Sequence, residues 1–296
     1  MTSNIYAQAD KNIRKTWLLM TLFLVIVIGI GYTFSYIYGD SSILYFAVVF
    51  AVLMNVISYW YSDKIVLKLH KATPVTKESQ RDLYNSLENL AITAGLPMPR
   101  LYIVEDAAPN AFATGRDEEH AVVCVTTGLL HLLNKNELEG VLAHELSHRG
   151  NRDILISTVI VVLAGFISIL SDIFLRSSMY GSRDRDSRAK GVILIVGIAL
   201  AILAPIAATL IQLAISRKRE FLADASGVLL TRFPEGLASA LRKINTNSIS
   251  MKTANTATAH LFIANPFARE SKGLSFVRKM FLTHPPAEDR IKALVG

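Results

Sequence analysis

Four long runs of uncharged, mostly apolar residues stand out in the pattern of polar and apolar positions. They cover residues 16–39, 41–62, 154–171 and 191–216, with lengths of 24, 22, 18 and 26 residues. A helix needs about 20 apolar residues to cross a bilayer core about 30 Å thick. Any one run also fits a buried core helix, but four in one chain favour a membrane protein. The pattern therefore predicts four transmembrane helices, with the third run at the lower limit of length.

The rest of the chain falls into two polar blocks, residues 64–153 and 217–296. In the first block, apolar residues at helical spacing predict a helix that has Thr76 as its N-cap and ends at Gly95 and Pro97. The apolar face of this helix would consist of Leu83, Leu87, Leu90 and Ala91.

Three short segments of the first block have the composition of strands. Residues 100–104 and 121–127 are rich in β-branched side chains, which favour strands. Residues 110–115, with the sequence NAFATG, lie between them and are predicted to form a short edge strand. With three short strands set among helices, the polar part of the chain is expected to have a mainly α-helical (α+β) fold.

A second helix of the first block is predicted to begin after Asn134, which forms an Asn-x-x-Glu capping pair with Glu137. Its core-facing residues would be Leu138, Val141, Leu142 and Leu146. In the second block, residues 216–231, 234–245 and 283–294 contain further helical patterns. The first of these patterns rests on the apolar residues Phe221, Leu222, Ala225 and Leu229.

The charged residues indicate how the chain lies in a membrane. The chain has a net charge of +7, and hydrophobic residues make up 51% of it. Its basic residues cluster beside the apolar runs, at Lys11, Arg14, Lys15, Lys64, Lys68, Lys71, Arg217, Lys218 and Arg219. This placement indicates membrane orientation and not nucleic-acid binding. Because the turn between the first two runs has no Lys or Arg, we expect the N-terminus and the first polar block in the cytoplasm.

The sequence HELSH, residues 144–148, is the first candidate for chemistry. His144 and His148 are four residues apart, so on a helix both imidazoles can reach one metal ion. Glu145 lies beside that face and has the position of a general base for water activated by the ion. A surface helix with two unrelated histidines has the same spacing, so the motif needs a third ligand.

A catalytic zinc usually takes three protein ligands. Cys124, the chain's single cysteine, lies on a predicted buried strand and has the role of a small hydrophobe there. Glu220 is the better candidate, and Asp224, one helical turn later on the same face, can orient a ligand histidine. On these residues alone, the alternative interpretation is that Glu220 and Asp224 are a solvated pair on a surface helix.

Together, HELSH, RKREFLAD at 217–224 and HPPAEDRI at 284–291 resemble the HtpX membrane metalloproteases, bacterial relatives of the CAAX prenyl proteases. The resemblance covers nearly the whole chain. It implies one zinc ion per chain held by His144, His148 and Glu220, with Glu145 as catalytic base. It also implies a supporting role for Asp224, a substrate-binding role for Asn110, and His284 near the scissile carbonyl.

The resemblance implies a gluzincin-like protease domain joined to the four transmembrane segments. Residues 1–63 would hold the N-terminal tail and the first two membrane helices, and 64–153 the first part of the protease domain. Residues 154–216 would hold the third and fourth membrane helices, and 217–296 the remainder of the protease domain. The expected location is the bacterial inner membrane, with the active site and both termini in the cytoplasm. The loop at 176–190, with five basic residues and two acidic, is unusual for an external loop, so a non-spanning hairpin stays open.

The expected reaction is hydrolysis of peptide bonds in misfolded or damaged membrane proteins, with self-cleavage during purification. Glu145 would take a proton from the attacking water and pass it to the leaving amine. A substrate peptide would pair as an added strand with the edge at 110–115, unless that segment is a plain surface hairpin. A CAAX-type prenyl protease, an intramembrane site-2-type protease and a non-catalytic zinc-dependent scaffold are the alternatives. The polar residues around HELSH count against the second, and Glu145 against the third.

Overall fold

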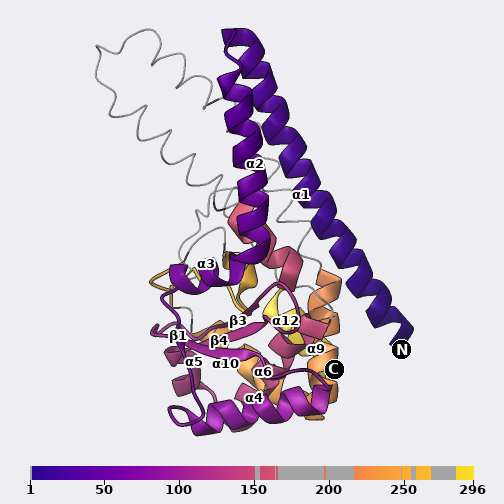
Figure 1. The fold of residues 1–296 in the computed structure, drawn as a ribbon. Helices are drawn as coiled ribbons and strands as arrows, with labels where there is room; N and C mark the ends of the chain where they lie inside the picture. Colours follow the sequence, from indigo (N-terminus) through magenta and orange to yellow (C-terminus); the bar gives the residue numbers. More distant parts are fainter. Residues whose placement is uncertain are drawn as a thin grey trace.

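The structure is a computed structural model and describes residues 2–150, 154–163, 165, 197, 217–247, 249–254, 258–267 and 285–296. Two long helices come first, α1 (Thr2–Tyr38) and α2 (Ser42–Trp60), and Figure 1 shows them side by side, projecting from the other labelled elements. Within the described ranges, Asn12–Tyr38 and Ser42–Trp60 are long and apolar enough to cross a membrane. The first two apolar runs are therefore confirmed as helices of membrane length.

A tight turn and a close contact hold α1 and α2 together. Gly39 has a φ of 66°, a left-handed conformation that glycine adopts without strain, and so ends α1. The Asp40 side chain then accepts a hydrogen bond from the backbone N–H of Ser42 at 2.9 Å, at the start of α2. Gly31 lies directly against the Ala47 side chain, where any larger residue would collide.

The third apolar run begins with a helix at Ile154–Leu163, and these residues are largely buried. Leu155, Val159 and Leu163 pack against Met20 and Phe23 of α1. Residues 164 and 166–171 of the third run, the fourth run apart from residue 197, and the loop at 176–190 lie outside the described ranges, so the crossing of the membrane by these two runs stays a prediction.

After α2, helix α3 (Ser62–Leu69) leads into a four-stranded sheet. Its strands are β1 (Thr73–Pro74), β2 (Arg100–Val104), β3 (Ala111–Thr114) and β4 (Val122–Thr126). The strand order is β1-β2-β4-β3, with β2 and β4 parallel and the other two pairs antiparallel. The three strands expected from composition are confirmed, and β3 is the outermost strand on its side of the sheet.

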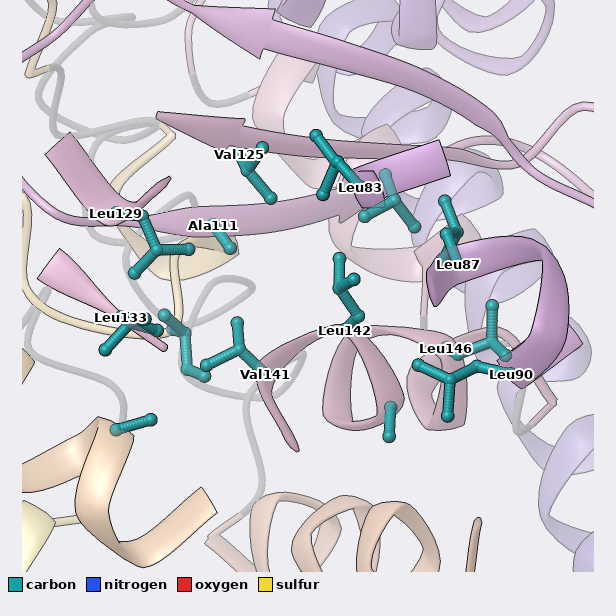
Figure 2. Close-up of a cluster of buried hydrophobic side chains, with 14 of the residues drawn as sticks. Leu83, Leu87, Leu90, Ala111, Val125, Leu129, Leu133, Val141, Leu142 and Leu146 are labelled. Atoms are coloured by element: carbon teal, nitrogen blue, oxygen red, sulfur yellow. The ribbon is translucent and has the colours of Figure 1, made fainter. Parts of the chain in front are cut away.

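The main core lies between this sheet and the helices α4 (Arg81–Ala94), α5 (Thr127–Leu132) and α6 (Lys135–Gly150). Figure 2 shows Leu83, Leu87 and Leu90 of α4 converging with Val141, Leu142 and Leu146 of α6 beneath Ala111 and Val125 of the sheet. These leucines belong to the apolar faces predicted for the two helices, and Gly95 ends α4 with a φ of 66° as expected.

The predicted start of α4 is wrong. The helix begins at Arg81, and Gln80 is its N-cap. The backbone N–H of Thr76 donates to Ser79 Oγ at 3.0 Å, and the N–H of Ser79 donates to the Thr76 carbonyl at 3.2 Å. Because Thr76 and Ser79 close a turn with each other, the Thr76 side chain does not cap the helix.

The second polar block packs onto the first through α9 (Arg217–Thr231), α10 (Pro234–Thr246) and α12 (Ala287–Val295). Both α9 and α10 lie against α6, and α12 lies against α9 and α10. A short 3₁₀ helix, η1 (Ala259–Leu261), precedes a segment that pairs with β3 at Phe112 and Phe262. Residues from both polar blocks therefore surround α6.

Candidate metal centre and active site

Helix α6 carries the HELSH sequence, and its start is fixed as the sequence predicts. The N–H of Asn134 donates to Glu137 Oε2 at 2.9 Å, and the N–H of Glu137 donates to Asn134 Oδ1 at 3.0 Å. This reciprocal pair satisfies two donors that a helix start leaves free. Glu137 also accepts from Ser239 and Lys243 of α10, at 2.6 and 2.7 Å, so the cap also ties α6 to α10.

Helix α9 reaches α6 closely enough to add a third ligand. His144 Nε2 and His148 Nε2 are 3.2 Å apart, His148 Nε2 and Glu220 Oε1 are 3.5 Å apart, and His144 Nε2 and Glu220 Oε2 are 3.8 Å apart. A tetrahedral zinc with bonds of about 2.0–2.1 Å holds its ligand atoms roughly 3.3 Å from one another. The three side chains therefore fit the geometry of a zinc site in both kind and spacing.

The close approach of the two helices depends on glycine. Gly227 of α9 faces the backbone of α6, and a Cβ there would lie 3.0 Å from the N atom of His144. The buried face of α9 carries Glu220, Ala223, Asp224 and Gly227. The predicted apolar stripe is not this face, because Ala225 and Leu229 are exposed. Polar residues face inward on α9 because they meet His144 and His148 there.

Glu145 is almost fully buried beside the three ligand candidates. Without a metal ion, burial raises its pKa to about 7 and the charge of Glu220 adds to the rise, whereas His148, Arg290 and the Ala113 N–H lower it. A carboxylate whose pKa lies near neutrality can both accept and return a proton at physiological pH. Its buried position beside the ligand candidates is the one that a general base would occupy.

Asp224 contacts the ligand candidate His144 on the side away from Glu220. The distance between His144 Nδ1 and Asp224 Oδ1 is 2.9 Å. Burial would raise the pKa of Asp224, but hydrogen bonds from Arg290 and His144 outweigh it and hold the pKa well below its usual range. For His144, burial and then Arg290 lower the pKa to about 4, against the pull of Asp224. A neutral imidazole is the form that binds a metal.

Arg290 is the residue of this site that the sequence analysis missed. It lies on α12, is 1% exposed, and donates from Nε and Nη2 to the two Asp224 oxygens at 2.8 and 2.6 Å. Two signals in the sequence point to it: its place in the HPPAEDRI motif, and its place on the inward face of α12 beside Ile291 and Leu294, where an arginine needs a buried acidic partner.

Asn110 lies at the start of β3 but does not face solvent. Its side chain is buried and binds the backbone of Ala264, with Nδ2 donating to the carbonyl at 2.9 Å and Oδ1 accepting from the N–H at 3.2 Å. The neighbouring Ala111 carbonyl accepts from the N–H of Ile263 at 3.0 Å. This end of the edge strand is therefore covered by the chain itself, and a substrate role of Asn110 stays a prediction.

Two other residues considered in the sequence analysis are His284 and Cys124. His284 lies outside the described residues, so its role near the scissile carbonyl also stays a prediction. Cys124 is fully buried on β4, and burial and then the charge of Glu145 raise the pKa of its thiol. The thiol is accordingly protonated at neutral pH and is not part of the ligand group, which comprises His144, His148 and Glu220.

Comparisons with known proteins identify the family of this chain. The sequence profile of peptidase family M48 matches residues 77–296. The Protease HtpX homolog of Caldanaerobacter subterraneus subsp. tengcongensis is 46% identical over 297 residues, covering 98% of this chain and 97% of that protein. The Protease HtpX homolog of Pyrococcus furiosus is 48% identical over 282 residues, covering 95% and 94%.

A solved structure shows the same fold. The crystal structure of S. mikatae Ste24p superposes with a TM-score of 0.50 at 20% identity, covering 95% of this chain and 67% of that chain. At this identity the likeness concerns the fold alone.

Proposed function

This chain belongs to peptidase family M48 and is a membrane metalloendopeptidase of the HtpX group, and from that premise we propose its cofactor, substrates and orientation. It uses one zinc ion, held by His144, His148 and Glu220, to cleave misfolded or damaged membrane proteins at the cytoplasmic face of a bacterial inner membrane. The observation that carries the proposal is the convergence of these three side chains, whose ligand atoms lie within 4.8 Å of one another, next to the buried Glu145.

The protein's own groups divide the work of hydrolysis. When bound, zinc supplies polarisation of the scissile carbonyl and lowers the pKa of the attacking water. Glu145 takes the proton of that water at its carboxylate and delivers it to the amine that leaves. Asp224 accepts the Nδ1–H of His144 and thereby keeps Nε2 free toward the ligand group.

The position of the site relative to the apolar helices supports membrane-protein substrates. Helix α6 ends at Gly150, and the apolar helix that begins the third run starts at Ile154. At the end of α2, the Arg116 guanidinium lies over the Trp60 ring with 4.6 Å to its centroid, and tryptophan side chains are enriched at the membrane interface. Cytosolic segments of membrane proteins would therefore reach the site close to the bilayer.

The proposal also concerns orientation. Basic residues flank the two membrane-length helices at Lys11, Arg14 and Lys15 before the first and at Lys64, Lys68 and Lys71 after the second. The turn between the helices carries no Lys or Arg, and the positive-inside rule then assigns both flanks to the cytoplasm. The third and fourth apolar runs would complete a multi-pass topology with both termini inside.

The test compares purified wild-type chain with Glu145→Gln in vesicles that contain an unfolded membrane-protein substrate. Wild type is expected to cleave the substrate and itself, and a chelator is expected to stop both. Glu145→Gln should retain about one zinc per chain yet cleave nothing, because it loses the base and no ligand. Cleavage by a zinc-loaded Glu145→Gln chain would refute Glu145 as the base, and zinc loss as complete as in His144→Ala would make Glu145 a ligand.

A further inference from the structure

Arg290 is a fully buried cation whose guanidinium lies next to Asp224, His144 and Glu220. Its Nε and Nη2 atoms fork onto the carboxylate of Asp224, and Nη1 donates to the Ile263 carbonyl at 3.4 Å. Nη2 lies 3.4 Å from both ring nitrogens of His144, and Nη1 lies 3.8 Å from Glu220 Oε2. One side chain of the last helix thus touches two of the three ligand candidates.

The fork determines which way the Asp224 carboxylate points. Asp224 Oδ1 both accepts from Arg290 Nη2 and lies 2.9 Å from His144 Nδ1, whereas Oδ2 is held by Arg290 Nε. With both oxygens fixed, rotation of the carboxylate away from His144 would break two charge-assisted hydrogen bonds. We propose that Arg290 is a positioning residue of the metal centre, which holds Asp224 against His144 so that His144 Nε2 faces the metal. This inference rests on the proposed role of His144 as a zinc ligand.

The charges around the fork explain why an arginine occupies this position. Glu220 and Asp224 stand one turn apart on α9, both buried, so their carboxylates repel each other. The guanidinium lies against both and offsets that repulsion. A lysine would keep the charge but cannot form two parallel hydrogen bonds to one carboxylate. Substitution of Arg290 by lysine therefore separates the effect of the positive charge from the effect of the two parallel hydrogen bonds.

A purely structural role makes a different prediction. Ile291 and Leu294 also fasten α12 to the main core. If Arg290 only docks this helix, then weakening the docking at Ile291 should disturb the metal centre equally. If Arg290 acts through Asp224, loss of the two hydrogen bonds from Arg290 should lower metal affinity when residue 224 is aspartate. The same loss should have no further effect when residue 224 has already been changed to asparagine.

The experiment measures zinc affinity by competition with a chelator, on full-length protein in detergent. All variants carry Glu145→Gln to prevent self-cleavage. Arg290→Lys is expected to bind zinc roughly 10–100-fold more weakly, the usual effect of removing a group that orients a ligand. Asp224→Asn should show a similar loss, and the double variant should equal Asp224→Asn within about threefold, because both changes remove one linkage. Ile291→Ala should lower the melting temperature but change zinc affinity less than about twofold.

The proposal would be overturned if Arg290→Lys bound zinc as tightly as the Glu145→Gln parent. It would also be overturned if the fold losses of zinc affinity in the two single variants multiplied in the double variant. An equal loss in Ile291→Ala would assign the effect to docking of α12. If Arg290→Lys does not fold, the double variant Asp224→Asn with Arg290→Gln, in which both charges are removed, is compared with Asp224→Asn alone. A tenfold difference in zinc affinity between these two variants would again overturn the proposal. Because the readout is zinc affinity, its failure is distinct from a failure of Glu145→Gln to abolish proteolysis.

Discussion

Gly227→Ala tests whether the packing of α9 against α6 sets the spacing of the zinc ligands. Gly227 lies two turns after Glu220 and faces the backbone of α6. A Cβ at Gly227 would lie 3.0 Å from the N atom and 3.2 Å from the Cα atom of His144, and 3.2 Å from the carbonyl carbon of Ala143. All three are backbone atoms of a helix, so no side chain can rotate away and the helices must separate.

The size of the effect follows from these distances. Non-bonded carbon atoms prefer about 3.5–4.0 Å, so α6 and α9 must move apart by roughly 0.5 Å at this point. Metal–ligand distances tolerate only about 0.2 Å, and Glu220 comes from one helix while His144 and His148 come from the other. We therefore expect zinc affinity to fall about tenfold, equivalent to about 1.4 kcal/mol. For folding stability, overpacking is expected to cost about 1–3 kcal/mol, and the better helix propensity of alanine offsets up to about 1 kcal/mol of this cost.

The assay is chelator competition in the Glu145→Gln chain, together with the melting temperature of the metal-free protein. Gly236→Ala is the matched control, because its Cβ would meet the Asn136 carbonyl at 2.8 Å, two turns before His144 on the same helix. It should lower stability with little change in zinc affinity. Unchanged zinc binding in Gly227→Ala, or an equal loss in Gly236→Ala, would refute the reasoning.

Three further outcomes are expected. Burial raises the pKa of Glu137, but hydrogen bonds from Lys243, Ser239 and the Asn134 backbone outweigh it and hold the pKa below its ordinary value. The loss of about 1 kcal/mol in Glu137→Gln should therefore be present at pH 7 and disappear as pH falls through this lowered pKa, which urea unfolding at neutral and acid pH measures. His284→Ala should retain zinc and lower kcat roughly 10²–10³-fold with little change in KM, and zinc loss would instead make it a ligand. A cysteine replacing Ser41 should react with a membrane-impermeant maleimide on intact cells and one replacing Lys77 should not, and labelling at both would contradict the proposed orientation.

Features that depend on neighbouring residues could be predicted from the sequence. The capping pair of Asn134 and Glu137 closes within four residues, and Gly95 ends α4 without help from elsewhere in the fold. Thr76 shows the limit of local rules. Its hydroxyl accepts a hydrogen bond from the N–H of Ser79 in a turn, and it therefore does not cap the helix that begins at Arg81. Both outcomes follow from interactions that span only three or four residues.

Features that depend on distant partners could not be predicted in this way. Arg290 meets His144 across 146 residues, and Asn110 meets Ala264 across 154. The apolar stripe predicted for α9 fails for the same reason, because its inward face is set by contacts with α6 and α12. The HELSH spacing gave the two histidines, but the geometry that holds them lies in these long-range contacts.

The β3 edge shows how such a contact constrains substrate binding. The Ala111 carbonyl accepts from Ile263, and the Ala113 N–H lies at Glu145, so the two outward positions of this strand meet different partners. Phe262 and Ile263 are 0% and 3% exposed, and re-exposing two such side chains costs about 3–6 kcal/mol. That cost equals roughly 10²–10⁴ in affinity, so a peptide that displaced them would need to recover it from new contacts. The other end of β3 is occupied as well, because the Ala113 N–H bonds to Glu145 and the Gly115 N–H donates to Thr158 Oγ1 at 3.4 Å.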